Sequence, residues 1–464
     1  MTSDSSTLRS LEAQHEEEDA VLFAPLEGTT RRFWVAVVVL VFIALLGISA
    51  YYVQFKLGLG VTGLNYTIYW GMYIVNTIFF IAISYGGTLT SAALRVLRVK
   101  WRTPITRAAE VMTVAALSIG GLNIVLDMGR PDRVLNIILY GRFRSPIVWD
   151  FYAVSIYLIF SVVYLYLPLI PDFAELQHKY PRRRWLYRPL SLGWKGSPRQ
   201  KKLLELGMDI MAYAMIPIAI MVHTVLSYMF ALTTQPMWHS TLLGPYFVMG
   251  AVYSGLAGLI IAMALLRRFM HLEEYLKPKH FNYLALFLLA MTSVWAYFTF
   301  SEYITTYYGQ EPSHTAVFNS KFFGEFAPLF YTQIVLCLVV PLILIFPRFR
   351  KIPGAVVASV SVLIGMWLER FLIIVPTLTR PRLPSDLPYT IGIYIATSTE
   401  WIIMAASAAA IVLIYLFMLK LFPIISVWEI REEREEEKEG VEREPEQPPK
   451  RRRVFGSPLI RRSS

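Results

Sequence analysis

Two ionisable side chains that could accept or donate protons, Asp150 and His223, lie inside long apolar stretches of the chain. Ionisable groups at membrane depth cost roughly 3 kcal/mol or more each, so they indicate function by default. A carboxylate and an imidazole at one depth could take up the two protons released when a quinol is oxidised, or supply them for the reverse reaction. The alternative is structural: Asp150 caps its helix near Ser145, and His223 hydrogen-bonds to a backbone carbonyl.

Other ionisable residues in apolar stretches suggest a proton route from the cytoplasmic face. The hypothesis places three carboxylates at inner or middle depth, Glu110, Asp209 and Glu400. Three further residues extend this set: Asp127, Glu369 and Arg370. Static pairing explains the same residues: Glu110 with Arg107, Asp209 with the basic inner loop, Glu400 with Thr397 or Thr399, and Glu369 with Arg370.

The segment 126–150 joins two predicted spans and carries four arginines, Arg130, Arg133, Arg142 and Arg144. Basic residues are disfavoured in loops on the outer face of the membrane, so a compensating interaction is expected. We predict that the four cluster at the outer face and dock a partner subunit or hold the site of Asp150. Pairing with the loop's own aspartates is the alternative.

Redox cofactors are not expected in this chain. Only His223 of the seven histidines falls well within a predicted span, whereas a haem of the b type needs two axial histidines. The single cysteine, Cys337, excludes an internal disulfide, a CxxC metal site and a cysteine-ligated cluster. We therefore expect no haem, iron–sulfur cluster or metal here, and any such centre would belong to a partner.

Long apolar segments must position these residues. Hydrophobic residues make up 55% of the 464 residues and charged residues only 17%, which excludes an ordinary soluble enzyme. The sequence predicts an all-α polytopic membrane protein. Its ten expected spans are 33–53, 67–94, 105–126, 147–169, 204–231, 243–266, 281–300, 327–346, 354–375 and 393–422.

The distribution of lysine and arginine predicts the orientation. If the N-terminus is inside, 34 of these 44 residues fall in inner segments and 8 in outer ones, so both termini are expected in the cytoplasm. The net charge of +11 then suggests anionic lipid headgroups rather than nucleic acid. No cleavable signal peptide is evident, because the acidic run at 16–19 precedes a full-length apolar segment.

We expect two four-helix bundles between flanking helices, because 69–96 and 246–268 share a weak internal similarity. The predicted units are a cytoplasmic segment 1–32, a flanking helix 33–53, bundles 67–231 and 243–375, a last helix 393–422 and a disordered charged tail 431–464.

Four motifs carry a resemblance to a known family. They are GRP at 129–131, SPIVWD at 145–150, VHTVLS at 222–227 and WHSTLLGPYF at 238–247. With their surroundings they resemble the NrfD-like, polysulfide reductase membrane-subunit family over most of 60–375, and look closest to the quinol-interacting subunit of alternative complex III. That pattern has histidine where this chain has Tyr85 in ISYGGT and Asp127 in LDMGRP.

The resemblance implies a respiratory subunit that is not catalytic alone. It implies a cofactor-free bundle in the cell inner or plasma membrane that binds menaquinone or ubiquinone near the outer face. The partner would be an iron–sulfur subunit on that face, together with a molybdopterin-type or multihaem cytochrome subunit in some assemblies. Electron exchange with this partner, coupled to proton translocation, is the expected function. The quinone-binding residues so implied are Asp150, His223, Trp149, Tyr152, His239 and Tyr246.

A secondary transporter or channel without a redox role is the alternative, since ten helices with a pseudo-repeat also fit that class. Transporters bind substrate at interrupted helices near the midplane. Few prolines fall in the middle of the predicted spans, Pro217 being the clearest, and this favours the redox interpretation.

Overall fold

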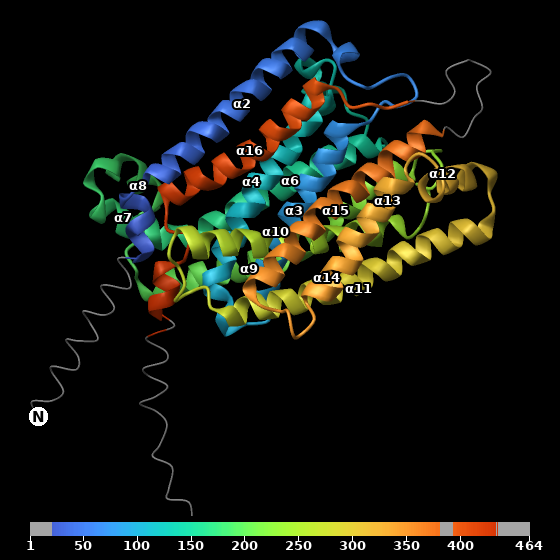
Figure 1. The fold of residues 1–464 in the computed structure, drawn as a ribbon. Helices are drawn as coiled ribbons and strands as arrows, with labels where there is room; N and C mark the ends of the chain where they lie inside the picture. Colours follow the sequence, from blue (N-terminus) through green and yellow to red (C-terminus); the bar gives the residue numbers. More distant parts are fainter. Residues whose placement is uncertain (1–20, 381–392, 433, 435–464) are drawn as a thin grey trace, which may run out of the picture.

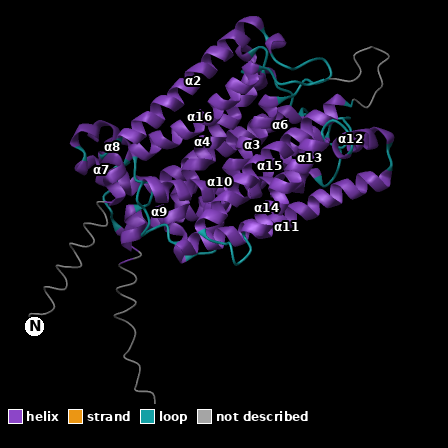
Figure 2. Ribbon diagram, in the orientation of Figure 1, coloured by secondary structure: helices purple, strands orange, loops and turns teal. Residues whose placement is uncertain are grey.

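The computed structural model describes residues 21–380, 393–432 and 434, and the regular structure in these ranges is entirely helical (Figures 1 and 2). Ten helical segments are long and apolar enough to cross a membrane, as predicted. They are α2 (Arg31–Leu57), α3 (Met72–Val96), α4 (Thr103–Asp127), α6 (Pro146–Tyr166) continued by α7 (Ile170–Lys179), α9 (Pro198–Ala231), α10 (Leu243–Phe269), α11 (Pro278–Gly309), α13 (Ala327–Ile334) continued by α14 (Val340–Leu344), α15 (Ile352–Thr379) and α16 (Ser398–Leu421).

Local sequence explains where several of these helices begin. Pro146, Pro198 and Pro278 each occupy the first position of a helix, where proline's missing N–H costs nothing. Ser197 also forms a capping box with Gln200 at the start of α9. Helix α9 therefore starts six residues before the predicted span, because its first turns are polar and apolar patterning alone misses them.

The two ends of the described chain meet at one end of the bundle, which we call the termini end (Figure 1). Lys420, at the end of α16, donates a 2.6 Å hydrogen bond to the carbonyl of Gly28. Tyr180 donates to Glu27 at 2.6 Å and lies between α7 and the short helix α8 (Arg184–Leu190). The opposite end, which we call the distal end, holds α5 (Asn136–Tyr140) and α12 (Pro312–Phe322).

Helices α3 and α4 form the centre of the molecule, with 78% and 72% of their most apolar windows buried, whereas only 6% of that of α2 is buried. Small residues bring neighbouring helices together. A Cβ placed on Gly86 of α3 would lie 2.2 Å from the backbone of Gly255 on α10. The backbones of these two helices are therefore in direct contact.

Proline interrupts the eighth span. Pro341 has no N–H to donate, and its ring would clash with the carbonyl of Cys337 four residues earlier, so the chain forms a π-helix over Val335–Val339. The Cys337 carbonyl instead accepts a 2.7 Å hydrogen bond from the hydroxyl of Tyr253 on α10, and Ser361 on α15 donates to Leu336. The interruption thus fixes this span to two neighbours.

Three parts of the fold were not predicted. They are the helices α7 and α8 after the fourth span, helix α5 in the loop between α4 and α6, which we call the distal loop, and helix α12. The division into two four-helix bundles stays a proposal. The tail predicted as disordered over 431–464 is helical at residues 431, 432 and 434, and Arg431 pairs with Glu175 of α7 at 2.9 Å, so the prediction is wrong at its start. The rest of the tail, the first 20 residues and the segment 381–392 lie outside the described residues.

Candidate functional site

Asp150 and His223 lie on packed neighbours, α6 and α9, toward the distal end. Asp150 is four residues from the start of α6 and His223 eight residues from the end of α9. At 1.5 Å per residue, they are about 6 and about 12 Å from those helix ends. Both residues therefore lie in the distal halves of their helices.

Both side chains keep polar atoms without hydrogen-bond partners among the described residues. Asp150 is 5% exposed and its Oδ1 has no partner, and His223 is fully buried with none for Nε2. His223 Nδ1 lies 3.4 Å from the carbonyl of Ala219, and the Tyr85 ring meets the imidazole edge-on at 4.5 Å. The helix cap at Ser145 makes no side-chain hydrogen bond, so capping does not explain Asp150.

Trp149 and Tyr152 lie beside the distal loop. The indole of Trp149 donates to the carbonyl of Phe143, and the Tyr152 ring stacks on the Phe143 ring with centroids 6.1 Å apart. The structure thus brings Trp149 and Tyr152 together through Phe143, next to Asp150 in the sequence.

Tyr246 lies in a cleft lined by residues of α10, α11, α12, α13 and α15 and of the loop before α10. Its hydroxyl donates to Glu369 Oε1 at 2.5 Å, and the indole of Trp295 donates to the same oxygen. Glu369 also forms a buried 3.0 Å ion pair with Arg370, the pairing that the static alternative expected. The Arg370 guanidinium lies 4.9 Å from the Phe247 ring.

Lys321 on α12 also lines this cleft, and sequence reasoning did not single it out. The side chain is 3% exposed, and burial lowers the pKa of Lys321 from 10.5 to about 8. Glu302 on α11 shares the cleft and accepts a 2.8 Å hydrogen bond from Ser240. A buried cation thus shares the cleft with the carboxylates of Glu302 and Glu369.

His239 lies at the distal surface, in the loop between α9 and α10. Its ring centroid is 4.6 Å from that of His314 at the start of α12. The described residues show no direct contact among Asp150, His223, Tyr246 and His239, whereas Arg370, which pairs with Glu369, interacts electrostatically with His223.

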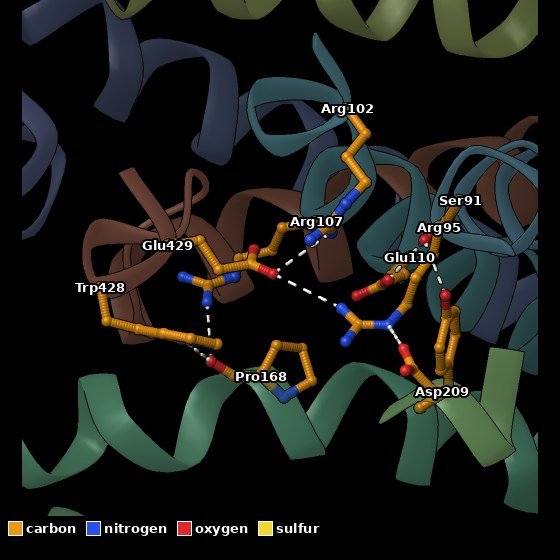
Figure 3. A network of polar contacts seen from close by, with 10 residues as sticks. Ser91, Arg95, Arg102, Arg107, Glu110, Pro168, Asp209, Trp428 and Glu429 are labelled. Atoms are coloured by element: carbon orange, nitrogen blue, oxygen red, sulfur yellow. Dashed lines mark hydrogen bonds and ion pairs between the residues drawn. The ribbon is translucent and has the colours of Figure 1, made fainter. Parts of the chain in front are cut away.

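A charged network closes the termini end of the bundle (Figure 3). Glu429, which follows α16, lies 3.6 Å from Arg95 and 3.2 Å from Arg102. Arg95 also pairs with Asp209 of α9 at 2.9 Å. Asp209 is thus held by an arginine of α3.

Glu110 lines a second, smaller cleft inside this network. It accepts a 2.6 Å hydrogen bond from Ser91, and its Oε2 has no hydrogen-bond partner among the described residues. Arg107 pairs with Asp172 of α7, which corrects the expected pairing of Arg107 with Glu110. Asp172 lies in the first turn of α7, which continues the span of α6, and this position brings its carboxylate to the guanidinium.

Glu400 was expected at inner or middle depth, and this expectation is wrong. It lies in the first turn of α16, at the distal end, where its Oε2 accepts hydrogen bonds from the backbone of Thr397 at 2.9 Å and Gly63 at 2.8 Å. Tyr394 donates to Oε1 at 2.6 Å. Glu400 is a capping-box residue, and Asp127 lies at the same end, at the last position of α4.

The arginines of the distal loop divide into one paired and three exposed residues. Arg130 forms a 2.8 Å ion pair with Asp132, as the local-pairing alternative expected. The structure gives no ion pair with another described residue to Arg133, Arg142 or Arg144. These three arginines are exposed at the distal end.

Sequence reasoning missed three residues of these sites, Lys321, Asp172 and Glu429, because no sequence motif marks them and only the tertiary fold brings them to their partners. Lys321 was visible only as the single basic residue of its predicted outer segment, and Asp172 and Glu429 fall in segments interpreted as inner loop and tail. A charged residue within an otherwise weakly charged loop is the one signal that could have found Lys321.

The helices and these polar sites indicate an integral membrane protein with buried ionisable side chains at both ends of its bundle. Residues 60–381 match the model of the family described as "Polysulphide reductase, NrfD". The match extends over more than half of the chain, and the protein belongs to this family.

Three curated proteins are similar to this chain. A protein of Halobacterium salinarum, provisionally named as a dimethyl sulfoxide reductase membrane subunit, is 32% identical over 52% of this chain and 53% of its own length. A selenate reductase subunit of Mesobacillus selenatarsenatis is 25% identical over 74% and 82%. The Hdr-like menaquinol oxidoreductase integral membrane subunit of Archaeoglobus fulgidus is 25% identical over 85% and 94%. The chain thus spans about half the length of the halobacterial relative.

Proposed function

We propose that this chain is the quinone-binding membrane subunit of a multi-subunit respiratory oxidoreductase. It binds menaquinone or ubiquinone and exchanges two electrons with an iron–sulfur subunit on the outer face, which corresponds to the distal end. The names of the three relatives support this assignment, because all are subunits of reductases or oxidoreductases and two are named as membrane subunits. In such a complex both termini lie in the cytoplasm.

One observation carries the proposal: Asp150 Oδ1 and His223 Nε2 are buried on packed helices without partners among the described residues. Buried polar atoms are normally hydrogen-bonded, so a missing partner points to a ligand or water. A quinone has two oxygens at opposite sides of its ring, and these could bond to the two groups. Asp150 would take one quinol proton and His223 the other.

Membership of the family also weighs against the transporter alternative. The one deep interruption among the described spans, the π-helix at Val335–Val339, has its two freed carbonyls occupied by Tyr253 and Ser361. Transporter-type sites instead use such carbonyls for substrate or coupling ions.

Proton translocation is the finer part of the proposal. Protons would enter from the termini end through the cleft at Glu110 and Asp209, while Asp127, Glu369 and Arg370 belong to the distal half. Whether the assembly is an alternative complex III is a further hypothesis within the same proposal.

Asp150→Asn tests the quinone site in the intact complex. Turnover of a soluble quinol analogue should fall at least about 100-fold, the usual contribution of a general base, while the complex still assembles. Asp132→Asn, at an exposed position of the loop that precedes α6, is the control. Unchanged turnover in Asp150→Asn with assembly intact would remove Asp150 from the mechanism, and His223→Gln applies the same test to the imidazole.

A further inference from the structure

Three potential metal ligands from two separate segments converge at the distal surface. His239 comes from the loop between α9 and α10, and Glu311 and His314 come from the start of α12. One nitrogen or oxygen atom from each lies within 4.8 Å of the other two. We propose that these residues form a binding site for a divalent metal ion of the zinc class.

The donor set selects the kind of metal. Imidazole nitrogen suits zinc, copper and nickel, whereas magnesium and calcium prefer sites built from oxygen alone. Two imidazoles and one carboxylate, with a fourth position for water, are a common zinc arrangement. The carboxylate balances one of the two positive charges.

The geometry allows ligation after small side-chain movements. Tetrahedral zinc with bonds of about 2.0 Å separates its ligand atoms by about 3.3 Å. The closest pair here, His314 Nε2 and Glu311 Oε2, are 3.8 Å apart. The remaining atoms need to approach by no more than about 1.5 Å, and His239 is exposed on a loop, so rotation of its side chain is unhindered by packing.

Helix α12, which carries Glu311 and His314 at its start, is held by a cap and by aromatic packing. Glu311 is the N-cap of α12, and its carboxylate accepts a 3.0 Å hydrogen bond from Ser313. Phe318 and Phe322 of α12 stack at 4.1 Å, and Phe322 packs edge-on against Tyr303 of α11 at 5.1 Å. Glu311 and His314 are therefore held in place by a packed helix, and His239 reaches them from the neighbouring loop.

A bound ion would join two loops at the mouth of the cleft that contains Lys321. Ser240, the residue after His239, donates its hydrogen bond to Glu302 in the cleft wall. Ligation of His239 therefore fixes the position of Ser240 as well. Metal occupancy should stabilise this corner of the fold independently of any quinone chemistry.

The test measures metal binding by the full chain purified without a histidine tag and stripped with a chelator. Zinc titrated into the wild type should bind at one site per chain and raise the unfolding temperature. In His239→Ala/His314→Ala zinc affinity should fall at least about 10-fold and the thermal shift should disappear. The matched control is His178→Ala/His271→Ala, which removes two other exposed histidines.

Copper identifies the ligands. Cu²⁺ bound to the wild type should show hyperfine coupling to two imidazole nitrogens in its electron paramagnetic resonance spectrum, and His239→Ala alone should leave one. Because this single variant changes an exposed loop residue, we expect it to fold like the wild type. Equal zinc affinity in the wild type and His239→Ala/His314→Ala, or a Cu²⁺ spectrum unchanged by His239→Ala, would overturn the proposal.

Discussion

The hydroxyl of Tyr246 and the carboxylate of Glu369 are joined by a 2.5 Å hydrogen bond that links α10 to α15. Both residues line the larger cleft, and the other oxygen of Glu369 faces Arg370. The bond therefore fixes a buried negative charge next to a buried positive one. This arrangement makes the cleft wall sensitive to the loss of either partner.

Glu369→Gln should destabilise the fold by about 3–5 kcal/mol, because it leaves the Arg370 guanidinium buried without its counter-charge. Tyr246→Phe removes one hydrogen bond to a charged group and should cost about 1.5–3 kcal/mol. Unfolding of the purified chain in detergent measures both. Tyr308→Phe, at an exposed residue, is the control, and a Glu369→Gln variant as stable as that control would contradict the pairing.

The ion pair between Arg107 and Asp172 predicts a similar effect at the termini end. Both side chains are almost fully buried, so Asp172→Asn should cost about 3–5 kcal/mol. Asp132→Asn breaks the exposed pair with Arg130 and should produce no measurable loss. Thermal unfolding of the two variants side by side checks the contrast, and equal losses would argue against it.

Lys321 should make stability depend on pH in the alkaline range. Its pKa is about 8 in the folded protein, against 10.5 for an ordinary lysine. Between these values the unfolded chain binds the proton that the folded chain has lost, so the folded state gains stability as pH rises. Relative to Lys321→Met, the wild type should therefore become more stable from pH 8 to 10.5. A stability difference independent of pH over this window would be inconsistent with a buried lysine.

The two ends of the bundle should respond differently in proton-uptake assays. In liposomes that contain the complex and a pH-sensitive dye, Glu110→Gln and Asp209→Asn should lower uptake from the termini side per electron transferred. Glu400→Gln should leave that ratio unchanged and lower stability instead, because Glu400 caps α16. If Glu110→Gln and Asp209→Asn both keep the wild-type ratio, the cleft has only a structural role.

The exposed arginines of the distal loop should contribute to docking. Arg142→Glu/Arg144→Glu reverses two exposed charges and should reduce recovery of the partner subunits with this chain, more strongly at low salt. Arg268→Glu, at an exposed position on α10 at the termini end, is the control. Undiminished recovery of the partners in the double variant would place the docking surface elsewhere.

Apolar length was sufficient to predict the membrane-spanning segments, because a helix that crosses a bilayer needs about 20 apolar residues. Helix caps and helix interruptions made the first and last residues of several spans differ from the prediction. The polar start of α9 lies outside the apolar window, and Pro341 lies in a span interpreted as continuous. Glu400 was placed too deep because the predicted last helix began at residue 393, whereas five residues before α16 are not helical.

Pairing between distant residues could not be predicted. Arg107 pairs with Asp172 rather than Glu110 because the helical span of α6 continues through the 3-10 stretch Leu167–Leu169 into α7, whose first turn lies beside Arg107. The cleft at Lys321 likewise requires α12 to fold back against α11. Depth along a helix follows from sequence, but the neighbour across a helix interface depends on rotation about the helix axis, which a single sequence does not specify.

The sparse packing of α2 has a consequence for biosynthesis. Its main neighbour is α16, and a Cβ on Gly47 would lie 2.1 Å from the Cβ of Ala406. The ribosome makes α2 long before α16, so α2 must lie in lipid without this partner until α16 has been made. Its 27 residues carry charge only near the ends, which allows α2 to persist as a lone helix. Synthesis of α16, rather than insertion of α2, therefore sets when this flank of the protein can assemble.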